Sequence, residues 1–312
     1  MIMDHAAKAD HRESGFIAVA VLWMLSSLAG LAVILSVFLI NTSQGLALDD
    51  DRLRSAALVS AGVELAAYKL SSSAKPLRAP AGSFTFRLDR AQVSVAFRSE
   101  AARIDLNHAS KEMLANLFGV LGARADMADA YARRVIGWRT PSAETAAAAD
   151  ADAERTLYRA AGPDRLPRAA PFASVDELRL VLDLPPALVD KAMPFVTVFS
   201  GRREIDALEA APEVVAALPG MTQDHLKSFL AQRTGLRRDN KSLAALGPAR
   251  AGATLEVADA VRLSIVVAFD SGRRSATEAV ILLDKGDDPY RILAWREDID
   301  ALTKLRKAAR AL

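Results

Sequence analysis

An uninterrupted apolar run, residues 16–40, limits most strongly what this chain can fold into. Phe16 to Ile40 comprises 25 residues without a charged side chain. As an α-helix rising about 1.5 Å per residue, it would extend ~37 Å, enough to cross the ~30 Å hydrocarbon core of a bilayer. A cleavable secretory signal has an apolar core of only about 7–15 residues. The sequence therefore predicts one membrane-spanning helix over residues 16–40 that stays in the mature protein.

A short polar leader, residues 1–15, directly precedes this run, so that Gly15 is followed at once by Phe16. This junction resembles the class III signal of type IV pilins and of type II secretion pseudopilins. In that family a membrane peptidase cuts after the Gly on the cytoplasmic side and methylates the new N-terminal Phe. The resemblance implies a processing site at Gly15 and Phe16. Lys8 and Arg12 agree with a cytoplasmic N-terminus.

The apolar run lacks a carboxylate that most pilins carry. Pilins have Glu at the fifth mature position, whereas the fifth residue counted from Phe16 is Ala20. A carboxylate inside the bilayer costs about 2.5–3.5 kcal/mol unless it is paired, so it is kept only where a neighbouring amine can meet it. The member of the family that typically lacks this Glu is the minor pseudopilin K, which is also unusually large.

Behind the span, helical spacing of apolar residues continues to about Ser72, where a serine run and two prolines end it. Strand patterning follows. Residues 84–88 and 93–97 show the two-residue period of a hairpin. Much later, alternate apolar residues over 261–269 share one face, and two further strand segments, 279–283 and 290–295, follow. Because a two-stranded hairpin is marginal alone, we expect the early and late strands to form one antiparallel sheet that covers the helix.

These patterns predict an α+β fold: a pilin-like N-terminal transmembrane helix packed on an antiparallel sheet, with a large all-α insert. The expected divisions are a leader (1–15), a pilin helix (16–72), a first β region (73–103), a helical insert (104–250), and a second β region with a C-terminal helix (251–312). The insert carries an internal repeat. Residues 104–120 align without gaps to residues 205–221, with identities at seven of the seventeen positions.

The first copy of the repeat, Ile104-Asp105-Leu106-Asn107 followed by Ala109, resembles the start of helix-hairpin-helix domains, some of which bind DNA. Phosphate binding there needs a Gly-x-Gly hairpin, in which backbone N–H groups approach the phosphate closely. The hairpins of this chain lack that motif, which favours structural use. The second copy has Leu208 where the first has Asn107, so the loop before its helix need not be fixed in the same way.

Net charge also argues against nucleic acid. The chain has 40 basic and 38 acidic residues, and removal of the leader leaves a net charge of +3. The arginine doublets are scattered among acidic residues, whereas a nucleic-acid binder concentrates basic charge on one face. We therefore expect no nucleic-acid partner.

Several further stretches resemble pseudopilin K in the order of that family. They are Ser99 to Asn107 at the junction of strand and insert, Trp138 with the following acidic loop and Tyr158, Phe172 to Leu178, Pro194 to Val198, and Leu293 to Glu297. The resemblance covers most of the chain from Gly15 to Glu297, and it rests on shared order rather than on any single motif.

The only candidate metal ligands are Asp150, Asp152 and Glu154, at alternate positions after an Ala-rich stretch read as a loop. Clustered carboxylates suit Ca²⁺, and pseudopilin K proteins can bind calcium in the insert. A solvated acidic loop is the competing interpretation. For catalysis there are no cysteines, and the single His108 and His225 have no evident nucleophile to serve, so we expect surface or capping histidines and no enzyme.

The resemblance implies a minor pseudopilin of a type II secretion system that caps the pseudopilus tip and primes its assembly. It requires no cofactor. Its partners would be other minor pseudopilins, pseudopilus subunits, the prepilin peptidase and the inner membrane, with the C-terminal domain in the periplasm. Two alternatives remain open: a membrane-anchored helix-hairpin-helix protein that binds DNA for uptake, and a plain single-span protein with an exported domain.

Overall fold

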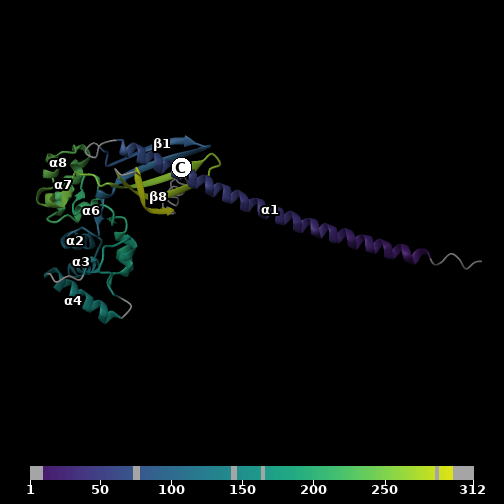
Figure 1. Ribbon diagram of the computed structural model, residues 1–312, viewed down its shortest axis with the longest axis horizontal. Coiled ribbons are helices and arrows are strands. Elements are labelled where there is room, and N and C mark those ends of the chain that lie inside the picture. The colour runs from purple at the N-terminus through teal and green to yellow at the C-terminus, as the bar shows by residue number, and fades with distance from the viewer. Residues whose placement is uncertain (1–9, 73–77, 142–145, 163–165, 285–287, 298–312) are drawn as a thin grey trace, which may run out of the picture. The chain divides into compact units, whose positions relative to one another are not determined.

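The computed structural model describes residues 10–72, 78–141, 146–162, 166–284 and 288–297 (Figure 1). Side chains are described for these ranges except residues 10–16, 39–51 and 146–152. The chain divides into two compact units, Met1–Ala57 and Leu58–Leu312. The predicted C-terminal helix falls on residues 298–312, outside the described residues.

The first element is the long helix α1, Asp10–Ser71. It confirms the helix expected over residues 16–72 and begins six residues earlier, within the predicted leader. Lys69 in its last turn complements the helix dipole. The Ser71 and Ser72 hydroxyls donate to the carbonyls of Ala67 and Tyr68 (2.7 and 2.6 Å), which adds two side-chain hydrogen bonds to the last turn.

The second unit contains a five-stranded antiparallel sheet. Its strands are β1 (Ala81–Leu88), β2 (Ala91–Ser99), β7 (Ala260–Phe269), β8 (Arg274–Leu283) and β9 (Tyr290–Glu297), in the order β1-β2-β7-β8-β9. The β1–β2 turn is a two-residue loop in which Asp89 and Arg90 both have positive φ (46° and 55°), as a tight hairpin requires. The β2–β7 pairing, with Val95 opposite Ile265, confirms that the early hairpin and the late strands form one sheet.

One face of this sheet packs against the part of α1 that belongs to the same unit. Buried helix residues with spacings of three and four lie against the alternate apolar residues of β2, β7 and β8. Gly62 permits the close approach: a Cβ at this position would lie 3.3 Å from methyl groups of both Val95 and Ile265. The apolar face of the helix and the apolar face of the strands thus form one hydrophobic core.

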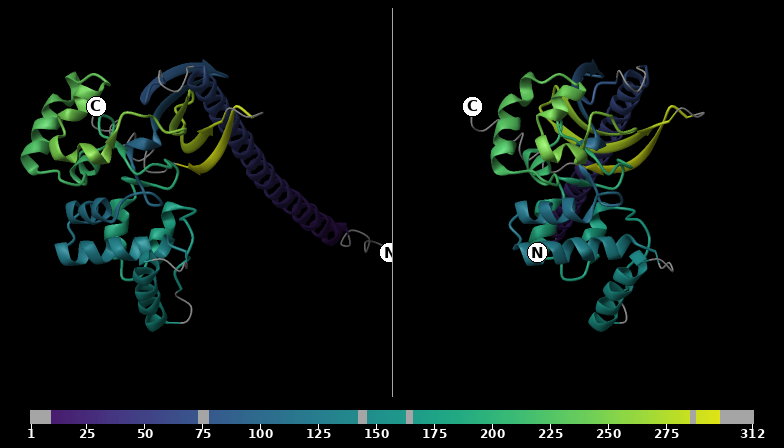
Figure 2. Two further views of the ribbon diagram at one scale, coloured as in Figure 1. Left: turned by 60° about the vertical axis from the view of Figure 1, so that its left-hand side comes forward. Right: turned by 90° about the vertical axis from the view of Figure 1, so that its left-hand side faces the viewer.

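Residues 100–259 lie between the paired strands β2 and β7 and are mostly helical. The helices are η2 (Glu100–Ala102), α2 (Lys111–Val120), α3 (Ala125–Arg139), α4 (Ala146–Ala161), η3 (Val175–Leu180), α5 (Pro186–Ala192), α6 (Pro212–Ala216), α7 (Gln223–Gln232), η4 (Arg233–Gly235), α8 (Asn240–Ala244) and η5 (Gly247–Gly252), where η marks a 3-10 helix. Helices α2–α4 (teal) and α6–α8 (green) form two groups in both views of Figure 2, and these groups share one hydrophobic core where α2 contacts α6.

The expectation of an all-α insert is wrong in one respect. Two short parallel strand pairs occur within it: β3 (Ile104–Asp105) with β4 (Val196–Thr197), and β5 (Ile205–Asp206) with β6 (Ala253–Thr254). Helical periodicity cannot reveal them because each strand is only two residues long. They close each helical group by pairing its first segment with a later one.

The two copies of the repeat have the same local structure. Each begins with a two-residue strand whose buried Asp accepts the backbone N–H two residues on: Asp105 from Asn107 (2.8 Å) and Asp206 from Leu208 (3.2 Å). Each copy then continues into a helix, α2 or α6. A helix-hairpin-helix identity for these repeats stays a prediction.

A second correction concerns the acidic segment after Trp138, which was expected to be a loop. Residues 146–161 form the helix α4, and alanine, the strongest helix former, predominates in its first turns. Tyr158 of α4 is buried, and its ring and the Phe172 ring each lie 6.1 Å from the ring of Trp138. Gly137 lets α3 and α4 approach, since a Cβ there would lie 2.8 Å from the Glu154 Cβ.

Candidate functional site

The first functional feature is the apolar segment of α1. Ile17–Phe38 comprises 22 residues with a mean hydropathy of 2.4, and none of the segment is buried in the protein. By length and composition it is the one helical segment, among the described residues, that could cross a membrane. Ala20 is exposed within it. The segment is consistent with a membrane anchor.

The predicted processing site lies just before this segment. Gly15 and Phe16 are part of helix α1, but their side chains are outside the described ones. The processing site stays a prediction.

The second feature is a cluster of buried charges where the chain leaves the sheet. Glu100, in η2 directly after β2, is 1% exposed and accepts from Arg262 of β7 at 2.7 Å (Nε to Oε1) and 3.1 Å (Nη2 to Oε2). Arg262 also donates to Glu278 of β8, and the Thr197 hydroxyl of β4 donates to Glu100. Burial alone would lower the pKa of Arg262, but Glu100 and Glu278 together raise it. The Arg262 guanidinium therefore stays charged.

The hydroxyl of Ser99 adds a further link at this junction. It accepts from the backbone N–H groups of Ala101 (3.3 Å) and of Ala258 (2.9 Å), two residues before β7 begins. Both ends of the insert are therefore held at one point. Since Thr197 also reaches Glu100, the junction joins the sheet to the first helical group as well.

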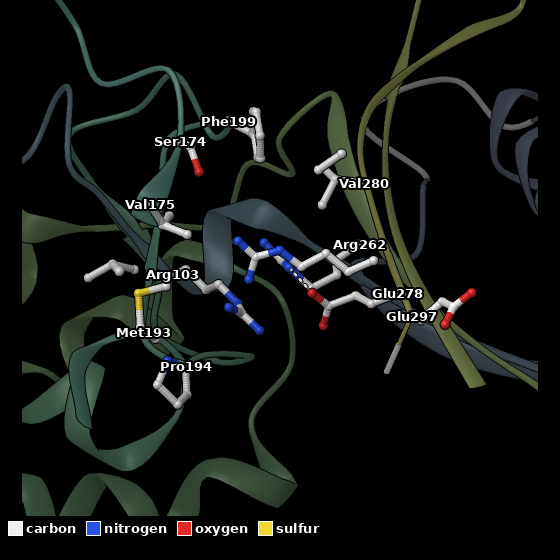
Figure 3. A pocket seen from close by; sticks show the side chains of 13 residues that line it. Arg103, Ser174, Val175, Met193, Pro194, Phe199, Arg262, Glu278, Val280 and Glu297 are labelled. Atoms are coloured by element: carbon white, nitrogen blue, oxygen red, sulfur yellow. Dashed lines mark hydrogen bonds and ion pairs between the residues drawn. The ribbon is translucent and has the colours of Figure 1, made fainter. Parts of the chain in front are cut away.

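A cavity of about 470 Å³ opens beside the cluster, between the insert and the sheet (Figure 3). Figure 3 shows the side chains of Arg103, Arg262 and Glu278 extending toward one another in it. Burial, and then the charge of Arg262, lowers the pKa of Arg103. At the sheet edge, Arg296 of β9 forms an ion pair with Asp176 of η3. This arrangement fixes the position of the insert on the sheet. Its ion pairs link the insert to β7, β8 and β9, and we therefore interpret it as structural.

The Asn at the start of the first repeat has a defined role. The amide of Asn107 donates to the Phe172 carbonyl (Nδ2 to O, 3.0 Å) and accepts from the Phe172 N–H (2.7 Å to Oδ1). Leu208, its counterpart in the second repeat, has no polar atom to do this. The difference anticipated from the sequence is therefore real: the two loops are fixed differently.

The structure changes the context of the three predicted metal ligands. All three positions lie on α4 rather than in a loop. The Glu154 carboxylate pairs with Arg134 of α3 (2.9 Å). Asp150 and Asp152 lie outside the described side chains, and the described residues contain no group of three potential metal ligands. A calcium site at Asp150, Asp152 and Glu154 stays a prediction.

His108 and His225 lie at solvent-accessible positions near the starts of helices. His108 is partly exposed, with Nδ1 3.2 Å from Asp105 Oδ1. His225 lies in the first turn of α7, where its backbone N–H donates to the hydroxyl of the N-cap Thr222 (3.3 Å). Neither belongs to the buried charge cluster.

Sequence reasoning named Glu100 only as part of a family-like stretch and did not single out Arg262 or Glu278. The available signal was opposite charges on adjacent strands that are otherwise apolar. It becomes specific only with the strand register, which places Arg262 opposite Val280, two residues from Glu278.

An apolar N-terminal helix whose second part covers an antiparallel sheet, interrupted by a helical insert, is the fold expected from the resemblance to pseudopilins. Residues 94–201 match the family model of the type II secretion system (T2SS), protein K. The fold is similar to that of a chain in the crystal structure of the GspK-GspI-GspJ complex from the enterotoxigenic Escherichia coli type 2 secretion system. That match has a TM-score of 0.52 and 15% identity and covers 82% of this chain and 99% of that chain. No curated protein matches.

The two matches together support a type II secretion minor pseudopilin K. The sequence match spans β2, the junction and the first helical group of the insert, which are the parts that contain Glu100, Asn107 and Glu154. Protein K is a structural component of the secretion system and not a known enzyme.

Proposed function

We propose that this protein caps the tip of a type II secretion pseudopilus and primes its assembly for protein export across the outer membrane. The observation that carries the proposal is the insert: residues 100–259, about half of the chain, lie between two paired strands of a five-stranded sheet. A fibre subunit must present an upper and a lower surface to its neighbours. Stacked copies would bring such inserts into collision, which is tolerable only where nothing packs above.

The membrane helix supports the same position. A carboxylate at the fifth mature position would need a neighbouring amine to offset its cost in the bilayer, about 2.5–3.5 kcal/mol. Ala20 stands there instead. A subunit at the end of the fibre has a neighbour on one side only, so the missing carboxylate fits an end position.

The partners would be two other minor pseudopilins, bound through the helical spine. The fold match to a chain of the GspK-GspI-GspJ complex supports partners of this kind. On the part of α1 that packs on the sheet, Tyr68 is 71% exposed, a large aromatic side chain of the type enriched at interfaces. After peptidase cleavage at Gly15, the chain would be anchored in the inner membrane with its C-terminal domain in the periplasm.

The stoichiometry of the complex tests the capping role. The full chain, co-expressed with the two partners and extracted in detergent, should form a complex that native mass spectrometry shows to contain one copy of it. Tyr68→Arg should weaken the complex, whereas Leu180→Arg, at a 64% exposed position on η3, should not. Homopolymers, or several copies per complex, would show that the capping role is wrong.

The DNA-binding alternative has a direct test of its own. The full chain in detergent should not retard duplex or single-stranded DNA at low salt, where counterion release favours even non-specific contacts. Salt-sensitive binding at micromolar affinity would favour the alternative.

A further inference from the structure

A second cavity, of about 650 Å³, lies inside the insert and is unusually basic. It is bounded by the start of α2, by α3 and by α4. Among the described residues that line it there are five basic side chains and one acidic one: Lys111, Arg133, Arg134, Arg139, Arg203 and Glu154. Its volume is within the range of ligand pockets, about 300–1,000 Å³. This cavity is distinct from the one at the junction.

Three of the five cations already have carboxylate partners. Lys111 and Arg133 share one carboxylate, that of Asp129, at 2.9 and 3.3 Å. Arg134 pairs with Glu154 (2.9 Å) and with Asp183 (3.0 Å). These contacts hold α2, α3 and α4 together, and they involve neither of the two remaining arginines, Arg139 and Arg203.

Arg139 and Arg203 carry this excess charge. Arg139 donates to backbone carbonyls, those of Leu106 and of Ala109 (2.7 Å), and to no carboxylate among the described residues. Arg203 is exposed and has no ion-pair partner in the described part of the chain. Burial lowers the pKa of Arg139 to about 10; the charge of Asp105 opposes this, and the nearby charge of Arg203 lowers it further. Two positively charged guanidinium groups thus line one cavity.

We propose that this cavity binds an acidic segment of another protein, with a carboxylate received by Arg203 and Arg139. The planar guanidinium fork matches a carboxylate in two parallel hydrogen bonds, and a negative group between the two arginines would offset their positive charge. Lys111, at the first position of α2, adds attraction from the same side. The proposal goes beyond the tip role and does not depend on it.

The lining of the cavity favours a peptide over a free anion or a nucleic acid. Ile136 and Leu157 line the same space, and Leu157 is 45% exposed. An apolar side chain next to the bound carboxylate would cover them, which inorganic phosphate cannot do. The carboxylates of Asp129 and Glu154 already pair with three of the five cations, so the remaining positive charge suits one or two carboxylates and not a row of phosphates.

Calorimetric titration of the full chain in detergent tests this. The probe is the capped tripeptide acetyl-Glu-Leu-Asp-amide, and the matched control is acetyl-Gln-Leu-Asn-amide. We expect the acidic peptide to bind about tenfold more tightly or better, as one or two charge-assisted hydrogen bonds imply, and to weaken with added salt. Arg203→Gln should lower its affinity about tenfold, and Leu157→Ser should lower it as well.

The control variant is Arg159→Gln, at an exposed position of α4 that does not line the cavity. It should change the affinity less than about twofold, because its charge is exposed outside the cavity and is screened by salt. Circular dichroism of each variant establishes that the fold is kept. Equal binding of the two peptides, or an affinity unchanged by Arg203→Gln, would overturn the proposal. So would phosphate binding as tightly as the peptide, or duplex DNA binding that depends on Arg203.

Discussion

Glu100 and Arg262 form an ion pair across the base of the insert, 162 positions apart in the chain. Two hydrogen bonds, of 2.7 and 3.1 Å, join them, and their side chains are 1% and 15% exposed. The pair links the turn after β2 to strand β7. It therefore joins the two places at which the chain leaves the sheet and returns to it.

Glu100→Ala should destabilise the protein strongly. Loss of one partner leaves Arg262 buried with only Glu278 to compensate it, and breaking a buried pair in this way costs about 3 kcal/mol or more. Asp270→Ala provides the matched control: its ion pair with Arg87 has side chains 55% and 65% exposed, so the cost should be about 0–1 kcal/mol. Urea unfolding of the full chain in detergent measures both, and equal costs would contradict the interpretation of the junction.

The sequence predicted the sheet well because its evidence was local and periodic. Val93, Val95 and Phe97 recur at every second position, as do the apolar residues on one face of β7, and this two-residue period is sufficient to assign strands. The charged junction could not be predicted in the same way. Glu100 and Arg262 look like surface residues until the pairing of β2 with β7 brings them together.

Asn107→Leu should cost about 1–3 kcal/mol, because it removes both hydrogen bonds to the Phe172 backbone and leaves partly buried polar groups unpaired. The second repeat provides its own control. Leu208→Asn, at the equivalent position, should bring no comparable gain in stability. Unfolding by urea, followed by far-UV circular dichroism, compares the two. A negligible effect of Asn107→Leu would show that the amide does not fix the loop.

The repeat shows which contacts can be predicted from the sequence and which cannot. Aligned residues predicted two similar segments, and Asp105 and Asp206 do accept equivalent backbone N–H groups. The partner of Asn107 lies 65 residues away and could not be identified from spacing. For α4, the acidic residues were read as a solvated loop, although the alanines around them favour a helix.

Ionisation of Tyr158 should lower the free energy of unfolding at alkaline pH. Burial raises the pKa of this phenol from its ordinary 10.0 to about 12, although the hydrogen bond from the Leu182 N–H (3.0 Å) acts in the opposite direction. Between pH 10 and pH 12 the unfolded chain loses this proton first, so the folded state is progressively less favoured as pH rises through that window.

The variant Tyr158→Phe isolates this effect. At pH 8 it should be less stable than the unmodified protein by about 1–3 kcal/mol, because the N–H of the buried Leu182 loses its acceptor. At pH 11 the difference should be smaller, since only the unmodified protein still loses stability by ionisation of Tyr158. Urea unfolding at the two pH values measures the difference. A difference that widens with pH would contradict the assigned shift.

The last prediction concerns maturation at Gly15 and Phe16, which adjoin the apolar segment without a spacer. If the prepilin peptidase recognises Gly15 and Phe16, the mature chain begins at methylated Phe16. Intact-mass measurement of the protein from membranes should show this. Gly15→Asp places a charged side chain at the residue before the cleaved bond, where the family has only a hydrogen atom. It should block cleavage and leave insertion intact, because the apolar helix that drives insertion is unchanged. Ser14→Asp adds the same charge one residue earlier and should still mature. An uncleaved N-terminus in cells that contain the peptidase would show that the helix is an ordinary membrane anchor.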